Sequence, residues 1–311
     1  MHWVDVAKAV AVTLVVAYHV SLTGMTMLTP GSNRAEEVFA AASTWLLPVR
    51  MPLFFLVSGL LAVRALERPW RQVLRPRVAD HLWVFALWTL LYAYPYASAY
   101  NPGNLEATTV RALSWTLSLN GAYWYLPLLV AFFVVAKLGR RIWPLLLLLG
   151  VVGYAFWSKV PLFGDGVVID SLLTGRRFLN FFIFFALGAF TRPLMERWAR
   201  VPSWTLPLLV AVYVPIALEL YGPERSPYQQ VLTAALSLIG ITFFLGASRV
   251  VAHWLPARRL GAYLAARTLP IYTFHPLLLA LVIWLTPGFG KQGSIVSIWL
   301  VPLLVVALTW V

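Results

Sequence analysis

The sequence predicts an all-α fold, a polytopic membrane bundle of about ten transmembrane helices that forms a single domain over residues 1–311. First, 61% of the residues are hydrophobic and only 11% are charged, whereas a soluble domain carries about 25% charged residues. Second, apolar runs of about 20 residues recur along the whole chain, and each is long enough to cross a bilayer. Third, backbone polar groups in lipid need partners within their own segment, which favours helices, and the short alternating segments of a membrane barrel are not found.

The ten predicted spans follow one another at roughly 4–24, 44–63, 80–98, 122–138, 142–158, 178–191, 204–221, 228–248, 266–286 and 294–311. The first apolar segment lacks a small-residue cleavage site after a basic leader, so we interpret it as a retained helix and not as a signal peptide. The sequence contains no internal repeat or low-complexity tract, and we expect no attached soluble domain.

The distribution of basic residues predicts the orientation. If the N-terminus is cytoplasmic, 15 of the 24 Lys and Arg residues lie on the cytoplasmic side, in the connections 64–77, 137–141, 192–200 and 249–267. Cytoplasmic loops of membrane proteins are enriched in these residues. The formal net charge of +13 therefore indicates topology and a lipid bilayer as partner, and we expect no nucleic acid to bind. The chain has no cysteine, which excludes a cysteine nucleophile and thiolate ligands, and we predict no metal site.

The first span carries polar side chains on one face. At about 100° per residue, Asp5, Lys8 and His19 fall within about 60° of one another, with His19 about 16 Å beyond Lys8. Charged groups in the bilayer are costly, so this face is expected to line a cavity. The alternatives are an interfacial ion pair between Asp5 and Lys8 and a hydrogen-bonded core histidine at position 19.

The second span opens with Arg50, next to Pro52, and is interrupted by Ser58 and Gly59. Small residues let helices approach closely, which is one explanation of the Ser-Gly pair. The other explanation is close approach of the backbone to a bound ligand.

An arginine-rich segment follows this span, with Arg64, Arg68, Arg71, Arg75 and Arg77. The first four have the spacing of one helix face, although Pro69 and Pro76 are expected to break the helix. The segment either contacts anionic lipid headgroups or binds a phosphorylated cofactor, since arginine binds phosphate in bidentate geometry.

Three further segments bear polar or aromatic residues. The ninth span places Thr268, Tyr272 and His275 on one face, and His275 is either structural or catalytic. Residues 123–125, Tyr-Trp-Tyr, open the fourth span and are typical of an aromatic belt at the membrane interface. Arg176 and Arg177 are expected to open the sixth span from the outer side.

In this order and spacing, the segments resemble the acyltransferase-3 family of integral membrane acyltransferases, close to its fucose 4-O-acetylase-like branch. Lys8 and His19 match the basic residue and the histidine, separated by ten residues, of the family's first helix. Four further segments of this chain resemble motifs of the branch: Trp3-x-Asp5-x-Ala7-Lys8, residues 51–59, residues 123–126 and Ile271-Tyr272-x-x-His275. Two departures concern Arg50, where related sequences often have histidine, and residues 127–129, Pro-Leu-Leu, where many members have a polar residue.

The resemblance implies transfer of an acyl group, usually acetyl, from acyl-CoA to a hydroxyl of an envelope or exported carbohydrate. This acceptor is either lipid-linked or free. Acetyl-CoA is then the donor substrate. It is polyanionic and is made in the cytoplasm, so we expect it to dock on the cytoplasmic face through Lys8, Arg71, Arg75 and Arg77. The implied location is the bacterial-type cytoplasmic (inner) membrane.

Within this hypothesis His19 is the general base that removes the proton of the acceptor hydroxyl, or alternatively the carrier of an acyl-imidazole intermediate. Ser58 and Tyr272 are candidate donors to the thioester carbonyl. The predicted catalytic set is completed by Asp5, which lies on the same helix face as His19, and by His275.

Two other classes of function compete with the enzyme. One is a carrier or flippase for an envelope lipid or small metabolite, although transporters often show inverted repeats and none is visible here. The other is a membrane sensor that binds acyl-CoA or glycolipid without turnover.

Overall fold

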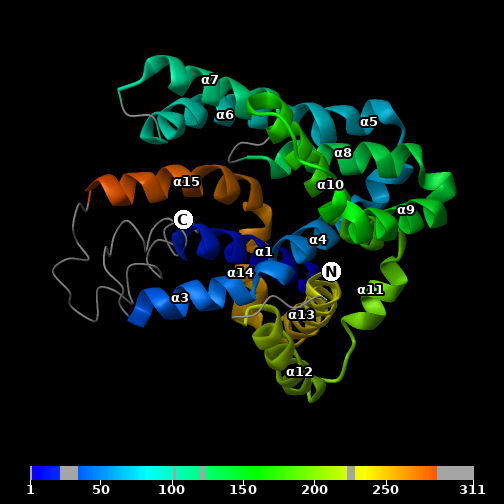
Figure 1. Ribbon diagram of the computed structural model, residues 1–311. Coiled ribbons are helices and arrows are strands. Elements are labelled where there is room, and N and C mark those ends of the chain that lie inside the picture. The colour runs from blue at the N-terminus through cyan, green and yellow to red at the C-terminus, as the bar shows by residue number, and fades with distance from the viewer. Residues whose placement is uncertain (1, 22–33, 101–102, 120–122, 223–227, 286–311) are drawn as a thin grey trace. The chain divides into compact units, whose positions relative to one another are not determined.

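The computed structural model describes residues 2–21, 34–100, 103–119, 123–222 and 228–285, and every regular element in these ranges is a helix (Figure 1). The helices that coincide with predicted spans are α1 (His2–His19), α4 (Leu47–Glu67), α6 (Asp80–Tyr100), α8 (Tyr125–Leu138), α9 (Trp143–Phe156), α10 (Gly166–Phe190), α12 (Thr205–Leu220), α13 (Gln229–Val251) and α15 (Thr268–Leu285). The connections contain α3 (Arg34–Trp45), α5 (Trp70–Leu74), η2 (Arg75–Ala79), α7 (Leu105–Leu117), η3 (Arg140–Ile142), η4 (Trp157–Lys159), α11 (Arg192–Trp198) and α14 (Leu255–Ala266).

The prediction of an all-α membrane protein is confirmed. By length and composition, four helical segments in the described part of the chain are long and apolar enough to cross a membrane: Leu47–Glu67, Arg140–Lys159, Gly166–Phe190 and Gln229–Val251. Tyr125–Leu138 and Thr205–Leu220 are shorter apolar helices. The predicted span 294–311 lies outside the described residues, so the number of ten spans stays a prediction. The cytoplasmic location of the N-terminus also stays a prediction.

The sixth predicted span begins at the wrong residue. Helix α10 starts at Gly166 and not near 178, so Arg176 and Arg177 lie inside the helix. Its first three turns contain polar residues, such as Asp170 and Thr174, so a search for apolar runs does not detect this part of the helix. Both side chains have hydrogen-bond partners at or just after α7: Ser114 Oγ donates to Asp170 at 2.7 Å, and Thr174 Oγ1 donates to the carbonyl of Ser118 at 2.8 Å.

The chain divides into two compact units, and the first comprises residues 1–54 and 193–311. In this unit α1 packs against α13, α14 and α15, and α12 packs against α13. The inward face of α1 is made of small and branched residues, and Ala7, Val12 and Val16 have no exposed surface. Lys8 Nζ donates to the carbonyl oxygen of Ala265 at 2.7 Å, which ties α1 to the last turn of α14.

The beginning of α4 belongs to the same unit and shows how a proline is accommodated in a membrane helix. Pro52 has no N–H, so the carbonyl oxygen of Pro48 lacks its helical partner. Ser237 Oγ of α13 donates to that oxygen at 2.6 Å. Gly240, one turn further along α13, lies so close to Val49 that an added Cβ would collide with its side chain. The two helices are therefore joined by a hydrogen bond and by close packing.

The second unit comprises residues 55–192. Here α9 pairs with α10 and α6 with α7. The rest of α4 touches α10 backbone to backbone, because an added Cβ at Gly59 would collide with the carbonyl oxygen of Phe185, and one at Gly188 with the carbonyl oxygen of Leu56. Close helix packing therefore explains Gly59.

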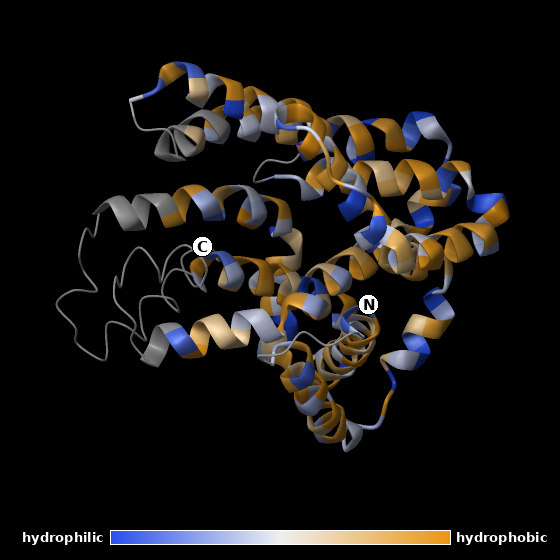
Figure 2. Cartoon of the chain, in the orientation of Figure 1, coloured by the Kyte–Doolittle hydropathy of each residue, from blue (hydrophilic) through white to orange (hydrophobic). Residues whose placement is uncertain are grey.

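Hydrophobic residues make up most of the helical segments in Figure 2. On α9, the exposed side chains include Leu148, Leu149 and Val151, each more than half exposed. A water-soluble protein rarely exposes contiguous apolar patches of this kind, whereas lipid tails cover them.

The arginine-rich segment is not one continuous helix. Helix α4 ends at Glu67, Pro69 caps the start of α5, and Pro76 lies in the π-helical turn η2. Arg71 is on α5, whereas Arg75 and Arg77 are on η2. As predicted, Pro69 separates two helices; at Pro76 the chain continues as a π-helical turn.

Candidate functional site

Two histidines from distant parts of the sequence meet in the first unit. His19 is the last residue of α1, and His275 lies in the second turn of α15. Their nitrogens, Nδ1 of His19 and Nε2 of His275, are 3.2 Å apart, and the ring centroids are 4.9 Å apart. His275 is buried, with 3% of its surface exposed, and His19 is partly buried. The structure thus brings together two of the predicted catalytic residues.

Each ring is also held by its own helix. His19 Nδ1 is 3.0 Å from the carbonyl oxygen of Val15, and His275 Nδ1 is 3.2 Å from that of Ile271. Both carbonyls belong to the residue four positions earlier. The ring of Tyr272 lies 5.8 Å from that of His275, so a third predicted residue borders the pair.

Arg50 lies in the same unit and is the residue to which sequence analysis assigned no role. Only 6% of its surface is exposed, and its guanidinium carbon is 3.5 Å from the centroid of the Tyr18 ring. Tyr18 precedes His19, and the centroids of their rings are 5.2 Å apart, so Arg50 lies in the neighbourhood of the histidine pair. An aromatic face stabilises a desolvated cation by about 2 kcal/mol. The sequence signal was its position, since a charged side chain inside an apolar helix is costly and is a candidate functional residue.

Asp5 and Lys8 lie at the other end of α1. Lys8 is hydrogen-bonded to the carbonyl of Ala265, one of the last carbonyls of α14, which commonly lack helical partners. Asp5 is partly buried in the first turn of α1. Of the polar residues predicted on one face of α1, His19 therefore contacts His275, whereas Lys8 links α1 to α14. A catalytic role of Asp5 and donor binding by Lys8 stay predictions.

The fifth predicted catalytic residue, Ser58, lies in the second unit. Its hydroxyl is 2.9 Å from that of Tyr125. The interpretation of residues 123–125 as an interfacial belt is wrong for the two tyrosines, because Tyr123 and Tyr125 are only 1% and 5% exposed. A belt and a buried aromatic core have the same composition, so the sequence could not separate them. Trp124 lies beneath the guanidinium of Arg177, whose carbon is 4.7 Å from the ring centroid.

The predicted donor-binding arginines of the second unit differ in exposure. Arg71 and Arg75 are exposed, and Arg75 Nε is 3.8 Å from a carboxylate oxygen of Asp80. Arg77 is half-buried, and its Nη2 donates to the carbonyl of Leu61 at 3.2 Å. Burial lowers the pKa of the Arg77 guanidinium, while the nearby Tyr125 acts in the opposite direction. Arg71 and Arg75 are thus accessible to an anionic ligand.

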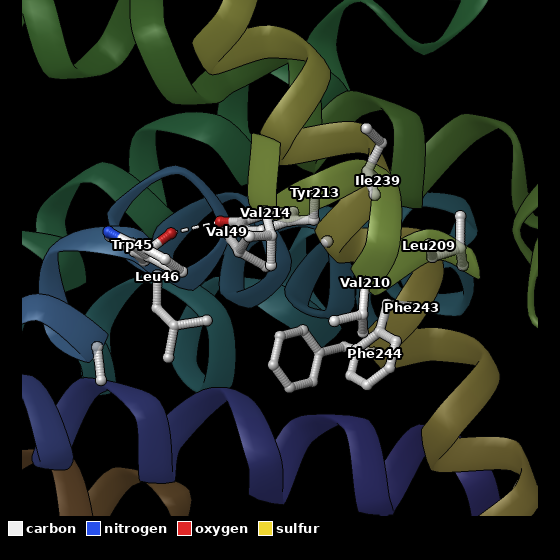
Figure 3. Close-up of a pocket in the computed structure, with 12 residues that line it drawn as sticks. Trp45, Leu46, Val49, Leu209, Val210, Tyr213, Val214, Ile239, Phe243 and Phe244 are labelled. Atoms are coloured by element: carbon white, nitrogen blue, oxygen red, sulfur yellow. Dashed lines mark hydrogen bonds between the residues drawn. The ribbon is translucent and has the colours of Figure 1, made fainter. Parts of the chain in front are cut away.

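A cavity of about 280 Å³ lies in the first unit, among α3, α4, α12 and α13 (Figure 3). It is lined by apolar side chains such as Val49, Val210 and Phe244, and at its edge the Tyr213 hydroxyl donates to the carbonyl of Trp45. No predicted site residue lines it. The cavity suits a hydrocarbon group.

Comparisons with known proteins place the chain in a family. The family model of an acyltransferase domain, that of the acyltransferase-3 family, matches residues 1–311. The inner membrane protein YcfT of Escherichia coli (strain K12) is 29% identical over 189 residues, which are 55% of this chain and 53% of that protein. The matched part thus spans about half the length of this curated relative. No solved structure matches the chain.

Proposed function

The chain belongs to the acyltransferase-3 family of membrane acyltransferases, and on this premise we propose that it transfers an acetyl group from acetyl-CoA to a hydroxyl of an envelope or exported carbohydrate. It is a multi-pass membrane protein, and we place it in the bacterial-type inner membrane because its relative YcfT is an inner membrane protein. The observation that carries the proposal is the pair of His19 and His275, whose nitrogens are 3.2 Å apart, with Arg50 against the neighbouring Tyr18.

In the proposed reaction His19 accepts the proton of the acceptor hydroxyl while the hydroxyl oxygen attacks the thioester carbonyl. The new C–O bond forms and the C–S bond breaks. The departing thiolate then accepts the proton from His19. Negative charge develops on the carbonyl oxygen during attack, and a fixed positive charge or hydroxyl donor near it lowers the barrier. Arg50 and Tyr272, in the unit that holds the histidines, and Ser58 are the candidates for this role.

The donor is proposed to dock through its phosphates. Arg71, Arg75 and Arg77 offer planar guanidinium groups, which bind phosphate in bidentate geometry. Lys8 is proposed to contribute a further positive charge, although its ammonium group is hydrogen-bonded to the carbonyl of Ala265. Arg77 is bonded in the same way to the carbonyl of Leu61, so the exposed Arg71 and Arg75 are the stronger candidates.

The decisive experiment uses the purified protein in lipid nanodiscs with radiolabelled acetyl-CoA and an envelope glycan extract. We expect label in the glycan with the wild type, and a loss of about 10²-fold or more with His19→Ala, since a general base contributes about 10²–10⁴-fold. His253→Ala is the matched control, because His253 is exposed on the loop after α13. Equal rates in His19→Ala and His253→Ala would reject His19 as the base.

The same protein in sealed vesicles separates the competing functions. A carrier or flippase moves label across the membrane without forming an acetylated product. A sensor binds acetyl-CoA without either result. Label in the glycan that depends on His19 is the outcome that only the acyltransferase produces.

A further inference from the structure

We propose that His275 is a positioning residue that holds His19 in the tautomer with its proton on Nδ1, so that Nε2 of His19 is the atom that accepts the hydroxyl proton. The inference rests on the proposed function for the reaction itself. The tautomer, however, is a property of the resting protein and can be measured without substrate.

The argument begins at the α15 end of the pair. The carbonyl oxygen of Ile271 can only accept a hydrogen bond, and it lies 3.2 Å from Nδ1 of His275. Nδ1 of His275 must therefore carry the hydrogen. A neutral imidazole has one N–H, which leaves Nε2 of His275 as an acceptor.

The second step follows from the contact between the rings. Nε2 of His275 is 3.2 Å from Nδ1 of His19, so the hydrogen of this bond has to come from His19. The same nitrogen lies 3.0 Å from the carbonyl oxygen of Val15, another group that only accepts. One Nδ1–H shared between two acceptors satisfies both contacts, and such three-centre bonds are common at helix ends.

The opposite tautomer fits neither contact. With the hydrogen of His19 on Nε2, the bare Nδ1 would face the lone pair of His275 Nε2 and the oxygen of Val15. Two polar contacts would then become repulsive in a largely buried position, where unsatisfied polar groups are costly. A second proton on either ring would place an additional positive charge near Arg50, whose guanidinium covers the ring of Tyr18, the residue before His19. The arrangement of neutral rings with Nδ1–H on both is the consistent one.

The consequence for catalysis is a free lone pair on Nε2 of His19. When this atom takes the proton of the acceptor hydroxyl, His19 becomes an imidazolium whose Nδ1–H remains bonded to His275 and Val15. These acceptors stabilise the charge until the Nε2 proton passes to the thiolate. An orienting partner on the far nitrogen has the same part in hydrolase triads, where loss of the correct tautomer costs about 10⁴-fold in kcat.

The tautomer is tested by solid-state ¹⁵N NMR of histidine-labelled protein in lipid, in which bare and protonated imidazole nitrogens have well-separated shifts. Signals of His19 and His275 are identified by their loss in His19→Gln and His275→Gln. We expect Nδ1–H and bare Nε2 for both rings. A wild-type spectrum with His19 protonated on Nε2 would overturn the inference.

Two variants of His275 test its positioning role. His275→Gln places an amide oxygen near the position of Nε2, where it can accept from His19. His275→Asn reaches only the position of Nδ1 and leaves His19 without this partner. We expect His275→Gln to retain kcat within about tenfold, and His275→Asn to lose about 10²-fold in kcat with an unchanged KM for acetyl-CoA.

The ¹⁵N spectrum of His275→Asn supplies a readout that a purely structural role would not change. We expect its His19 to populate both tautomers, in protein that elutes as a single species in size-exclusion chromatography. Wild-type kcat together with an unchanged His19 signal in His275→Asn would refute the positioning role. If no label transfer is detected although wild-type His19 has the expected tautomer, the proposed function fails and the tautomer assignment stands.

Discussion

At the scale of single residues, the proposed chemistry of this chain depends on a few polar side chains inside apolar helices. A charged side chain at mid-bilayer costs on the order of 2.5–3.5 kcal/mol, so each needs a local partner. Arg50 has the ring of Tyr18, and Lys137 donates to the carbonyl oxygens of Leu66 and Arg68 at 3.0 and 2.5 Å. Lys137 thus caps the C-terminal end of α4, next to the arginine-rich segment, and its role is structural.

The exposed arginines lead to a prediction about donor affinity. Arg75→Ala removes an exposed guanidinium whose pairing with Asp80, at 3.8 Å, stabilises the fold by at most about 1 kcal/mol. We therefore expect an unchanged unfolding temperature and a KM for acetyl-CoA raised by about tenfold, since a hydrogen bond to a charged group contributes about 1.5–3 kcal/mol. Steady-state kinetics over a range of acetyl-CoA concentrations measure the change.

Arg259→Ala is the control for this prediction. Arg259 is exposed, lies in another connection on the same predicted side, and its removal changes the net charge equally. If both variants raise KM alike, the arginines act through their general charge. If neither does, Arg75 contacts lipid headgroups and not the donor.

At the scale of elements, the second unit depends on the contact between α4 and α10. Gly59 and Gly188 face each other's helices reciprocally, and each would strike a backbone oxygen of the other helix if it carried a Cβ. A backbone oxygen cannot move aside as a side chain can. The helices would have to separate, which disturbs the segment that carries Ser58.

We predict that Gly59→Ala lowers the free energy of unfolding by about 1–3 kcal/mol, the usual cost of overpacking. Gly175→Ala in α10 is the matched control, because among the described residues an added Cβ would meet no atom of another helix within 4 Å, and it is expected to be neutral or stabilising by about 0.4–1 kcal/mol. Thermal unfolding in detergent, followed by tryptophan fluorescence, compares the two. Equal midpoints would show that α4 and α10 do not touch at Gly59.

At the scale of the whole molecule, the orientation predicted from the basic connections can be tested with single cysteines, because the chain has none of its own. Arg141 and Lys159 are exposed at the two ends of the apolar segment that contains α9. With a cytoplasmic N-terminus, a membrane-impermeant maleimide should label Lys159→Cys in intact cells, and Arg141→Cys only after lysis. The reverse pattern would place the N-terminus outside, and equal labelling of both would show that the segment does not cross the membrane.

The sequence by itself determined the membrane class, the helical fold, the approximate positions of most apolar helices and the family resemblance. These follow from composition, run length and motif spacing, which are local properties of the chain. It did not reveal the polar start of α10, because Asp170 and Thr174 interrupt the apolar pattern while Ser114 and the Ser118 carbonyl satisfy them.

Only the tertiary structure decided which polar residues lie together. His19 and His275 are 256 positions apart, and no periodicity relates α1 to α15. Likewise Arg50 gained a partner in Tyr18, and Lys8 a carbonyl on α14, through packing between helices. A buried polar group takes the partner that the fold places beside it, so its identity is a property of the packed chain and not of any segment.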